Sequence, residues 1–233
     1  MTRLFAPRGA LLLGILALAS CSHASQVGSP DSMRAGADGW RSLPLTAFRG
    51  YKDQEIPKGW SVVDGNTIQK TGEAEDLVSR EQFGNFELTL DWKLAPGGNS
   101  GLFYRATEEY EHIYWSGPEY QLLDNARHPD GKNPLTQAGS AYGLYAPPAG
   151  AAHEAGEWNS TRIVARGNHI EHWLNGAKVA DYEIGSPDWT AKVAKSKFGA
   201  WPNYGKAARG YIGIQGDHTG LLAIRDIKIK VLP

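Results

Sequence analysis

Residues 86–94 read FELTLDWKL, and this stretch decides the fold class. Apolar side chains alternate along it with Glu, Thr, Asp and Lys, which is the period of two that a half-buried β-strand shows. Residues 96–99, Pro-Gly-Gly-Asn, then supply a turn, because Gly and Asn tolerate positive φ, and a second strand is predicted through Arg105. We expect the two strands to pair as a hairpin.

Short strand-like segments separated by turn residues continue along the rest of the chain. Asp-Gly-Asn at residues 64–66 and Asn-Gly at residues 175–176 each predict a tight turn between two strands. A further strand is predicted at residues 139–145, and the only good helical stretch covers residues 188–198. Many short strands with one short helix predict an all-β fold, a two-sheet antiparallel β-sandwich.

Acids and amides interrupt the apolar and aromatic run that follows the second strand. If residues 119–123 form a strand, Glu119 and Gln121 share one face of it, and Asp124 lies just past its end. Such a strand presents polar groups on one side and Tyr and Leu on the other. It is therefore a candidate for the floor of a binding site.

The residues that flank this strand favour a ligand site. Tyr114, Trp115 and Tyr120 supply aromatic rings and Arg105 supplies a charge, which together suit a sugar-sized ligand. An antiparallel sheet also has one solvated face as a rule. On that alternative interpretation the acids of residues 119–124 simply pair with neighbouring arginines at the surface.

Composition excludes several classes of protein. The chain has 233 residues, a formal net charge of -1 and a pI of about 6.7, so it offers no electrostatic reason to bind nucleic acid. Eight Trp and ten Tyr against six Phe are typical of wet aromatic binding faces as well as of cores. A phosphate-binding glycine loop, an HExxH zinc motif and a serine nucleophile elbow are all missing from the sequence.

The start of the chain resembles an export signal. Arg3 and Arg8 precede an apolar run over residues 10–19, and Leu-Ala-Ser-Cys ends it at Cys21. This ending resembles the bacterial lipobox, which implies a lipoprotein signal peptide at residues 1–20 and lipid attachment at Cys21. An ordinary signal peptide with an incidental Cys is the alternative. As the only Cys, Cys21 leaves room for neither an internal disulfide nor a Cys-based zinc site.

The predicted signal divides the chain into three parts. Residues 21–39 are rich in Ser, Gly, Asp and Ala and predict a flexible tether, and residues 40–233 form the β-sandwich domain. By resemblance to sorted lipoproteins, Ser22 after the Cys favours the outer membrane. We therefore expect a domain held by a lipid anchor in the periplasm or at the cell surface.

Six motifs resemble, in order, those of the 3-keto-disaccharide hydrolase domain family. They are NSGLFYR (99–105), GPEYQLLDN (117–125), GSAYGLY (139–145), GEWN (156–159), HWLNG (172–176) and GYIGIQ (210–215). The similarity covers about Leu45 to Leu232. It implies a concanavalin-like lectin/glucanase jelly roll that is usually exported and acts on 3-keto-glycosides made by a separate sugar 3-dehydrogenase. One departure is Gly216, an extra residue that shifts His218 relative to the family pattern.

The chemistry of such substrates defines what the site must contain. A ketone at C3 acidifies the hydrogen on C2, so the glycosidic bond can break by β-elimination, and hydration of the enone completes a net hydrolysis. The reaction needs a base for C2–H, an electrophile at the C3 oxygen and an acid for the leaving oxygen. Glu119, Asp124 and His218 are the candidates for acid and base, and Arg105 or a bound divalent cation is the candidate for the enolate oxygen.

Other residues are candidate sugar contacts. Gln121 and Asn99 carry amides that grip hydroxyl pairs, while Tyr142 and Trp158 offer rings that stack on a sugar face. Trp158 has the alternative of a core position, which is usual for large aromatics in sandwiches. His218 has the alternative of a turn histidine that caps a strand.

Three further functions stay open at this stage. An ordinary glycosidase would use two carboxylates on an unoxidised sugar, but their separation cannot be derived from sequence. A non-catalytic carbohydrate-binding lipoprotein would use the same fold to capture sugar. A structural envelope lipoprotein would show neither activity nor affinity for sugar.

Overall fold

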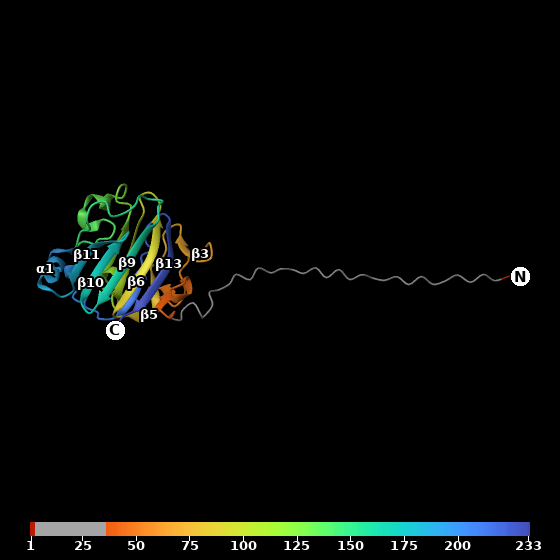
Figure 1. Cartoon of the computed structure of the whole chain (residues 1–233), viewed down its shortest axis with the longest axis horizontal. Helices are drawn as coiled ribbons and strands as arrows, with labels where there is room; N and C mark the ends of the chain where they lie inside the picture. Colours follow the sequence, from red (N-terminus) through yellow and green to blue (C-terminus); the bar gives the residue numbers. More distant parts are fainter. Residues whose placement is uncertain (3–35) are drawn as a thin grey trace.

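The structure, a computed structural model, describes residues 1–2 and 36–233 of the chain (Figure 1). Most of the predicted signal peptide, Cys21 and most of the predicted tether lie outside the described residues, so those predictions remain predictions. The first strand, β1, covers Trp40–Ser42. In the described part of the chain, no helix is both long and apolar enough to cross a membrane.

Two antiparallel sheets form the domain, as predicted. The larger has eight strands in the order β11-β10-β9-β6-β13-β4-β3, with β1 pairing to β13 as well. Figure 1 views this sheet face-on. Its remaining strands are β3 (Trp60–Val63), β4 (Thr67–Lys70), β6 (Phe86–Leu94), β9 (Asn159–Arg166), β10 (His169–Leu174), β11 (Ala177–Glu183) and β13 (Leu222–Val231).

The smaller sheet has five strands in the order β2-β5-β12-β7-β8. They are β2 (Phe48–Gly50), β5 (Leu77–Phe83), β12 (Gly210–Ile214), β7 (Asn99–Ala106) and β8 (Glu119–Leu123). The outer edge of the edge strand β8 is not left unpaired. The amide of Gly139 donates to the carbonyl oxygen of Gln121 at 2.8 Å, and the amide of Gln121 donates to that of Ser140 at 3.2 Å. A loop therefore covers the edge, which otherwise invites pairing with other chains.

One α-helix, α1 (Pro187–Lys195), lies beside the β11 edge of the larger sheet in Figure 1. The Ser186 hydroxyl caps it by accepting from the amide of Trp189, and Pro187 fills the first turn. Five short 3-10 segments complete the described structure: η2 (Leu45–Ala47), η3 (Ile113–Trp115), η4 (Pro129–Lys132), η5 (Pro134–Thr136) and η6 (Lys197–Ala200).

The core lies between the two sheets. Along β6 the burial alternates at every residue, with Phe86, Leu88, Leu90, Trp92 and Leu94 buried, as the period of two predicts. These side chains belong to the same buried cluster as the inward residues of β7 and β8 in the smaller sheet. Burial of apolar area at this interface is the main force that holds the sandwich together.

The predicted hairpin of β6 and β7 is wrong. Both strands exist, but β6 pairs with β9 and β13 in the larger sheet, whereas β7 pairs with β8 and β12 in the smaller one. The turn after β6, closed by the bond from the Gly98 amide to the Ala95 carbonyl at 2.9 Å, carries the chain across the sandwich. Each strand keeps its apolar face in the core, because the inner faces of the two sheets pack against each other.

The predicted turns at residues 64–66 and 175–176 are confirmed, since they join β3 to β4 and β10 to β11. The strand predicted at residues 139–145 is not confirmed. These residues form turns with two isolated bridges, from Ala141 to Tyr120 and from Ala141 to Tyr145. Gly139 and Gly143 adopt positive φ there, which interrupts an extended strand.

Candidate active site

The candidate site lies on the outer face of the smaller sheet, over β7 and β8. Alternation along β8 sends Tyr120 and Leu122 into the core, while Glu119 and Gln121 point to the other side. Loops from four parts of the chain cover that face, so even these polar side chains are buried. The cavity that remains has a volume of about 210 Å³. It is lined by Asn99, Tyr114, Glu119, Gln121, Asp130, Tyr142, Lys197, Gln215, Asp217 and His218.

The carboxyl group of Glu119 fits against the sheet because it lies over a glycine of β7, Gly101, the residue paired with Gln121. A Cβ on Gly101 would collide with Oε1 of the Glu119 carboxyl group. Only 6% of Glu119 is exposed, and burial raises the pKa of its carboxyl group to about 8, although Lys197 acts in the opposite direction. Near neutral pH the group is therefore mostly protonated and can act as an acid.

Gln121 connects Glu119 to the strand beside it. In the amide orientation that satisfies both of its polar atoms, Nε2 donates to the Ser100 carbonyl and to Glu119 Oε1, both at 3.0 Å. Gln121 has no exposed surface, and Asn99 lies next to it in the cavity wall. The amide thus fixes the carboxyl group of Glu119 and leaves its second oxygen to the cavity.

Lys197 brings a positive charge to the cavity from the start of η6. Its ammonium lies 4.5 Å from the ring centroid of Tyr142 and 5.6 Å from that of Tyr114. Rings at these distances attract a cation through their π faces. The two tyrosines therefore hold the ammonium at the cavity, where it can meet a developing negative charge.

His218 reaches the cavity from the loop between β12 and β13. The buried ammonium of Lys70 on β4 donates to the carbonyl oxygens of His218 and Gly72, and the Gly216 amide donates to Asp76 at 2.8 Å. Partial burial is the largest cause and lowers the pKa of the His218 imidazole. Asp217 acts in the opposite direction, while the nearby His128 and Lys70 lower the pKa further. The ring is therefore neutral at neutral pH and available as a base.

The extra Gly216 is accommodated by close backbone packing. A Cβ at this position would lie 2.5 Å from the carbonyl oxygen of Ala74, so only glycine fits. The Ala74 amide in turn donates to the Gly216 carbonyl at 2.9 Å. The loop is thereby attached to the segment before β5, and His218 still lines the cavity.

Two more polar groups complete the wall. Gln215 is 7% exposed, and its buried Oε1 has no hydrogen-bond partner among the described residues. A buried acceptor of this kind calls for a partner from a ligand or water. The hydroxyl of Tyr142 donates to Asp130 Oδ2 at 3.4 Å, which places both side chains at the same rim.

Asp124 does not line the cavity. Its Oδ2 accepts from the Gly97 amide at 2.7 Å and its Oδ1 accepts from the Ala126 amide at 3.1 Å. The carboxylate therefore joins the turn before β7 to the end of β8. This geometry supports a structural role in place of the predicted acid–base role.

Arg105 also lies away from the cavity. It sits at an irregular point of β7 with φ of 52°, and its Nε donates to the Gly84 carbonyl at 2.9 Å. The left-handed backbone at Arg105 breaks the alternation of the strand, which is why the side chain departs from the Glu119 face. Lys197 is the cation that lines the cavity in its place.

Three predicted sugar contacts lie elsewhere. Tyr120 is fully buried and its hydroxyl donates to the Trp173 carbonyl. Trp158 lies on the larger sheet, where the guanidinium carbon of Arg225 is 4.0 Å from the centroid of the Trp158 ring. Trp115 is outside the cavity wall, but its ring meets that of Tyr114 edge to face, with centroids 6.0 Å apart.

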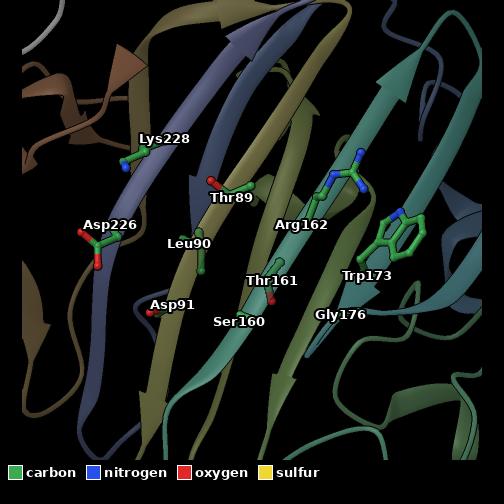
Figure 2. A pocket seen from close by; sticks show the side chains of 10 residues that line it. All are labelled: Thr89, Leu90, Asp91, Ser160, Thr161, Arg162, Trp173, Gly176, Asp226 and Lys228. Atoms are coloured by element: carbon green, nitrogen blue, oxygen red, sulfur yellow. The ribbon is translucent and has the colours of Figure 1, made fainter. Parts of the chain in front are cut away.

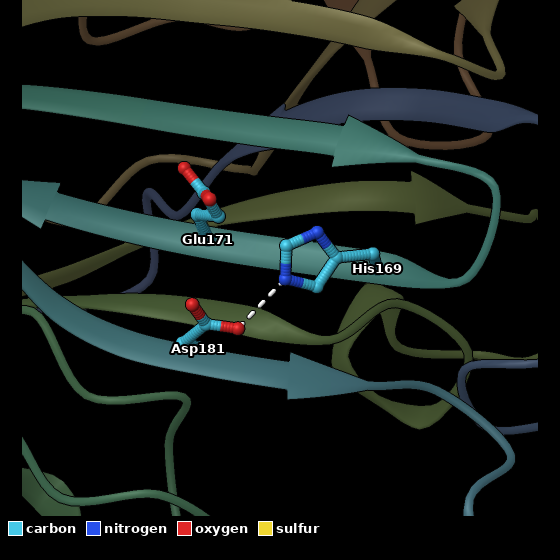
Figure 3. A group of neighbouring side chains, drawn as sticks. All are labelled: His169, Glu171 and Asp181. Carbon is cyan, nitrogen blue, oxygen red and sulfur yellow. Dashed lines mark hydrogen bonds and ion pairs between the residues drawn. The ribbon is translucent and has the colours of Figure 1, made fainter.

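A cluster of metal-ligand types lies far from this cavity. His169, Glu171 and Asp181 place ligand atoms within 4.8 Å of one another (Figure 3), and no other group in the described residues does so. However, Lys178 Nζ lies 2.8 Å from Glu171 and 2.7 Å from Asp181. The ammonium already pairs with both carboxylates, so the cluster is an ion-pair network of the sheet surface.

In the cavity itself, Asp130, Asp217 and His218 are donor types that a divalent cation accepts. His218 Nε2 lies 3.6 Å from Asp217 Oδ1, but the three side chains do not form a group as close as the one on β10 and β11. The predicted divalent cation therefore stays a prediction.

A second hollow crosses the outer face of the larger sheet (Figure 2), with a volume of about 390 Å³. Trp173, Arg162, Thr89 and Lys228 stand opposite one another on four successive strands and line it. Cations already lie near the Trp173 ring, at 5.0 Å for Arg162 and 5.4 Å for Lys178. None of the candidate acid and base residues lines this hollow, so the cavity at Glu119 remains the candidate site.

Similarity to known proteins identifies the family of this chain. Residues 38–230 match the family described as the 3-keto-alpha-glucoside-1,2-lyase-like domain. The chain belongs to this family. It is 32% identical to the 3-keto-disaccharide hydrolase of Bacteroides thetaiotaomicron over 250 aligned positions, which cover 91% of this chain and 86% of that protein.

Solved structures share the fold. A protein of Parabacteroides distasonis, provisionally named a glycosyl hydrolase, superposes with a TM-score of 0.77 and 30% identity, covering 89% of this chain and 99% of its own. A second protein of that organism with the same provisional name superposes with a TM-score of 0.62 and 27% identity. The match covers 79% of this chain and 99% of that protein. This chain thus shares its fold with both solved structures.

Proposed function

We propose that the chain cleaves the glycosidic bond of 3-keto-glycosides by β-elimination followed by hydration, in the cavity around Glu119. That it is a glycoside-cleaving enzyme follows from its family and from its 3-keto-disaccharide hydrolase relative. The finer statement, an elimination on an oxidised sugar, rests on the groups that line the cavity.

The opposite pKa shifts of Glu119 and His218 carry this proposal. Burial raises the pKa of Glu119 to about 8 and lowers that of His218, so the cavity holds a protonated acid and a neutral base at neutral pH. Pairs of titratable groups whose pKa values are shifted in opposite directions are typical of acid–base pairs in active sites. Lys197 adds a positive charge to the wall of the same cavity.

In the first step His218 takes the proton from C2 of the 3-keto sugar. The electron pair forms the enolate of the C3 ketone, and the Lys197 ammonium stabilises its oxygen. Collapse of the enolate forms the C1–C2 double bond and breaks the bond between C1 and the glycosidic oxygen. Protonated Glu119 gives its proton to that oxygen, and the aglycone leaves as an alcohol.

The second step reverses the proton movements. Ionised Glu119 takes a proton from water as the water oxygen bonds to C1 of the enone, and the imidazolium of His218 returns its proton to C2. The sugar leaves as a free 3-keto sugar, and both side chains regain their starting states. Asn99, Gln121 and the unpartnered Oε1 of Gln215 are placed to hold the sugar hydroxyls.

Matched glucosides test the proposal. Purified protein is incubated with methyl 3-keto-glucoside and with plain methyl glucoside, with and without a chelator. We expect cleavage of the oxidised sugar alone, because only the ketone makes C2–H acidic. Comparable cleavage of the plain sugar contradicts the elimination, and loss of activity with the chelator shows that a divalent cation takes part.

Substitution of Glu119 separates catalysis from binding. Glu119→Gln keeps the shape of the side chain but removes its transferable proton, so turnover should fall by about 10²–10⁴-fold while sugar still binds. If the wild-type protein binds 3-keto-glycoside and never releases product, the carbohydrate-binding alternative is correct.

We also propose that the chain is an exported lipoprotein anchored through Cys21 and supplied with substrate by a sugar 3-dehydrogenase. The signal-like start of the sequence supports export, and the ketone of the substrate requires an oxidation at C3 by another enzyme. Cell fractionation of wild type and Cys21→Ala tests the anchor. Wild type should sediment with the membranes, and the variant should not.

A further inference from the structure

The cavity at Glu119 is too small for a whole glycoside with a large aglycone. Its volume of about 210 Å³ lies below the roughly 300–1,000 Å³ of pockets that enclose drug-sized ligands. The cavity therefore encloses the sugar ring that reacts. The group on the other side of the glycosidic bond must lie on the surface next to it.

An aromatic ridge starts at one wall of the cavity. We use this name for Tyr114, Trp115 and Trp201, all half-buried. Tyr114 lines the cavity and meets Trp115 edge to face, and Trp115 stacks on Trp201 with centroids 4.9 Å apart and an interplanar angle of 16°. Asp130 and Asp217 also line the cavity and add charged groups to its wall.

The same two 3-10 segments build both the cavity and the ridge. Segment η3 gives Tyr114 to the cavity and Trp115 to the ridge, while η6 begins with Lys197 in the cavity and is followed directly by Trp201. Ile113, fully buried, packs closely over Gly213 and anchors η3 to the sheet. The position of the ridge relative to the reacting sugar is thereby fixed.

Hydrogen bonds tie the two loops of the ridge together. The Gly205 amide donates to the Ser116 carbonyl at 2.8 Å, and Asn203 Nδ2 donates to Glu109 Oε2 at 2.9 Å. The ridge is thus held in place before a ligand arrives, which lowers the entropic cost of binding.

Beyond Trp201 the surface turns apolar. A second cavity of about 290 Å³ is lined by Trp201 together with Pro202, Val193, Ile184 and Trp189. A second sugar ring needs hydrogen-bond partners for its hydroxyls, and these side chains offer few. Aromatic rings, by contrast, gain from stacking on Trp and from burial of apolar area.

We propose that the aromatic ridge is the aglycone subsite of the enzyme and that it selects 3-keto-glycosides with an aromatic aglycone. This inference rests on the proposed function, since the ridge has a role in catalysis only if a glycoside reacts at Glu119. Trp115 and Trp201 then determine specificity without contacting the reacting atoms.

The first experiment compares two substrates that share their sugar. Trp115→Leu and Trp201→Leu, which keep apolar bulk but lose the flat ring, are assayed with phenyl 3-keto-glucoside and methyl 3-keto-glucoside. We expect kcat/KM to fall about tenfold for the phenyl substrate and to stay unchanged for the methyl one. Trp158→Leu is the matched control, because Trp158 is also half-buried but lies on the larger sheet.

The second experiment needs no variant and therefore does not depend on folding of the substituted chains. Plain phenyl and methyl glucosides, which lack the ketone, are tested as inhibitors of the wild-type enzyme acting on methyl 3-keto-glucoside. We expect the phenyl glucoside to inhibit about tenfold more strongly. A plain glucose disaccharide should inhibit no better than the methyl glucoside.

Several outcomes overturn the proposal. Equal losses for both substrates mean that the tryptophans only support the fold, and stronger inhibition by the disaccharide means that the ridge receives sugar. Failure of the proposed function is a separate result, in which the wild-type protein cleaves no 3-keto-glycoside. In that case calorimetry with phenyl and methyl glucosides still measures whether the ridge binds aromatic groups.

Discussion

Glu119 and His218 face one cavity, but their surroundings move their pKa values in opposite directions. Glu119 is enclosed by the sheet and its covering loops, whereas 38% of the His218 side chain is exposed and shares its loop with Asp217. For both groups the largest cause is the loss of water around the charged form. Burial favours the protonated carboxyl group and the neutral imidazole, which gives each its role.

These shifts predict the pH dependence of kcat/KM. The acid must be protonated, so activity should fall as pH rises through about 8, where Glu119 ionises. The base must be neutral, and because the pKa of His218 lies below the usual 6.5, the acid limb should lie below that pH. A profile in which activity rises through pH 8 would mean that ionised Glu119 is the base.

Substitution of Gly101 should lower activity while the protein still folds. An added Cβ collides with the Glu119 carboxyl group, so Gly101→Ala should displace that group and lower kcat on the order of 100-fold. Gly72→Ala is the control, because it has open space around its Cβ position and no positive φ. Steady-state kinetics with methyl 3-keto-glucoside distinguish the two, and equal kinetics for both variants contradict the prediction.

The sequence predicts the strand-borne part of the site but only some of its loop-borne residues, namely Tyr114, Tyr142 and His218. Glu119, Gln121 and Asn99 follow from alternation, since a strand fixes which side chains share a face. Lys197, Asp130 and Asp217 reach the cavity from loops, where no periodicity relates them to one another. The placement of Lys197 at the end of the helical region is the only local signal that marks it.

At the scale of elements, the turn between β6 and β7 decides where the site lies. Alternation identifies both strands, but it is equally compatible with a hairpin and with a crossing between sheets. The choice depends on which distant strands pair with each, and local sequence does not contain that information. Regular alternation along β7 also predicts Arg105 next to Glu119. The left-handed backbone at Arg105 interrupts that alternation and directs the side chain toward Gly84.

Asp124, just after β8, holds that turn by accepting a hydrogen bond from the Gly97 amide. We therefore expect its replacement to lower stability. Asp124→Ala removes the acceptors of two backbone amides, so the free energy of unfolding should fall by about 1–3 kcal/mol, as measured with denaturant. We expect kcat to stay close to that of the wild type. A large loss of kcat with unchanged stability would return Asp124 to the catalytic role that its position after β8 suggested.

At the scale of the whole molecule, a lysine of the larger sheet holds the loop that joins the two sheets, between β12 and β13. Lys70 is 1% exposed on β4, and its ammonium donates to the carbonyl oxygens of Gly72, His218 and Gly220. Its charge also lowers the pKa of His218. The base of the proposed mechanism is therefore positioned by the strand that pairs with β13, where Lys70 lies opposite Leu222.

Lys70→Met tests this coupling. Loss of the hydrogen bonds should loosen the His218 loop and lower kcat about tenfold. Loss of the positive charge should raise the pKa of His218, which moves the acid limb of the pH profile to higher pH. Arg41→Met, which breaks an exposed ion pair with Glu81, is the control and should leave the profile unchanged. An unshifted acid limb in Lys70→Met refutes the coupling.

The loop that covers the edge of β8 has a consequence for solubility. Its residues 139–142 occupy the backbone groups of the strand that carries Glu119, so the loop both closes the cavity and hides a strand edge. Variants that detach it to admit larger substrates would also expose unpaired amides and carbonyls, which recruit other chains. Enlarging the cavity from this side therefore brings a risk of aggregation, whereas changes at the loops of the aromatic ridge leave that edge covered.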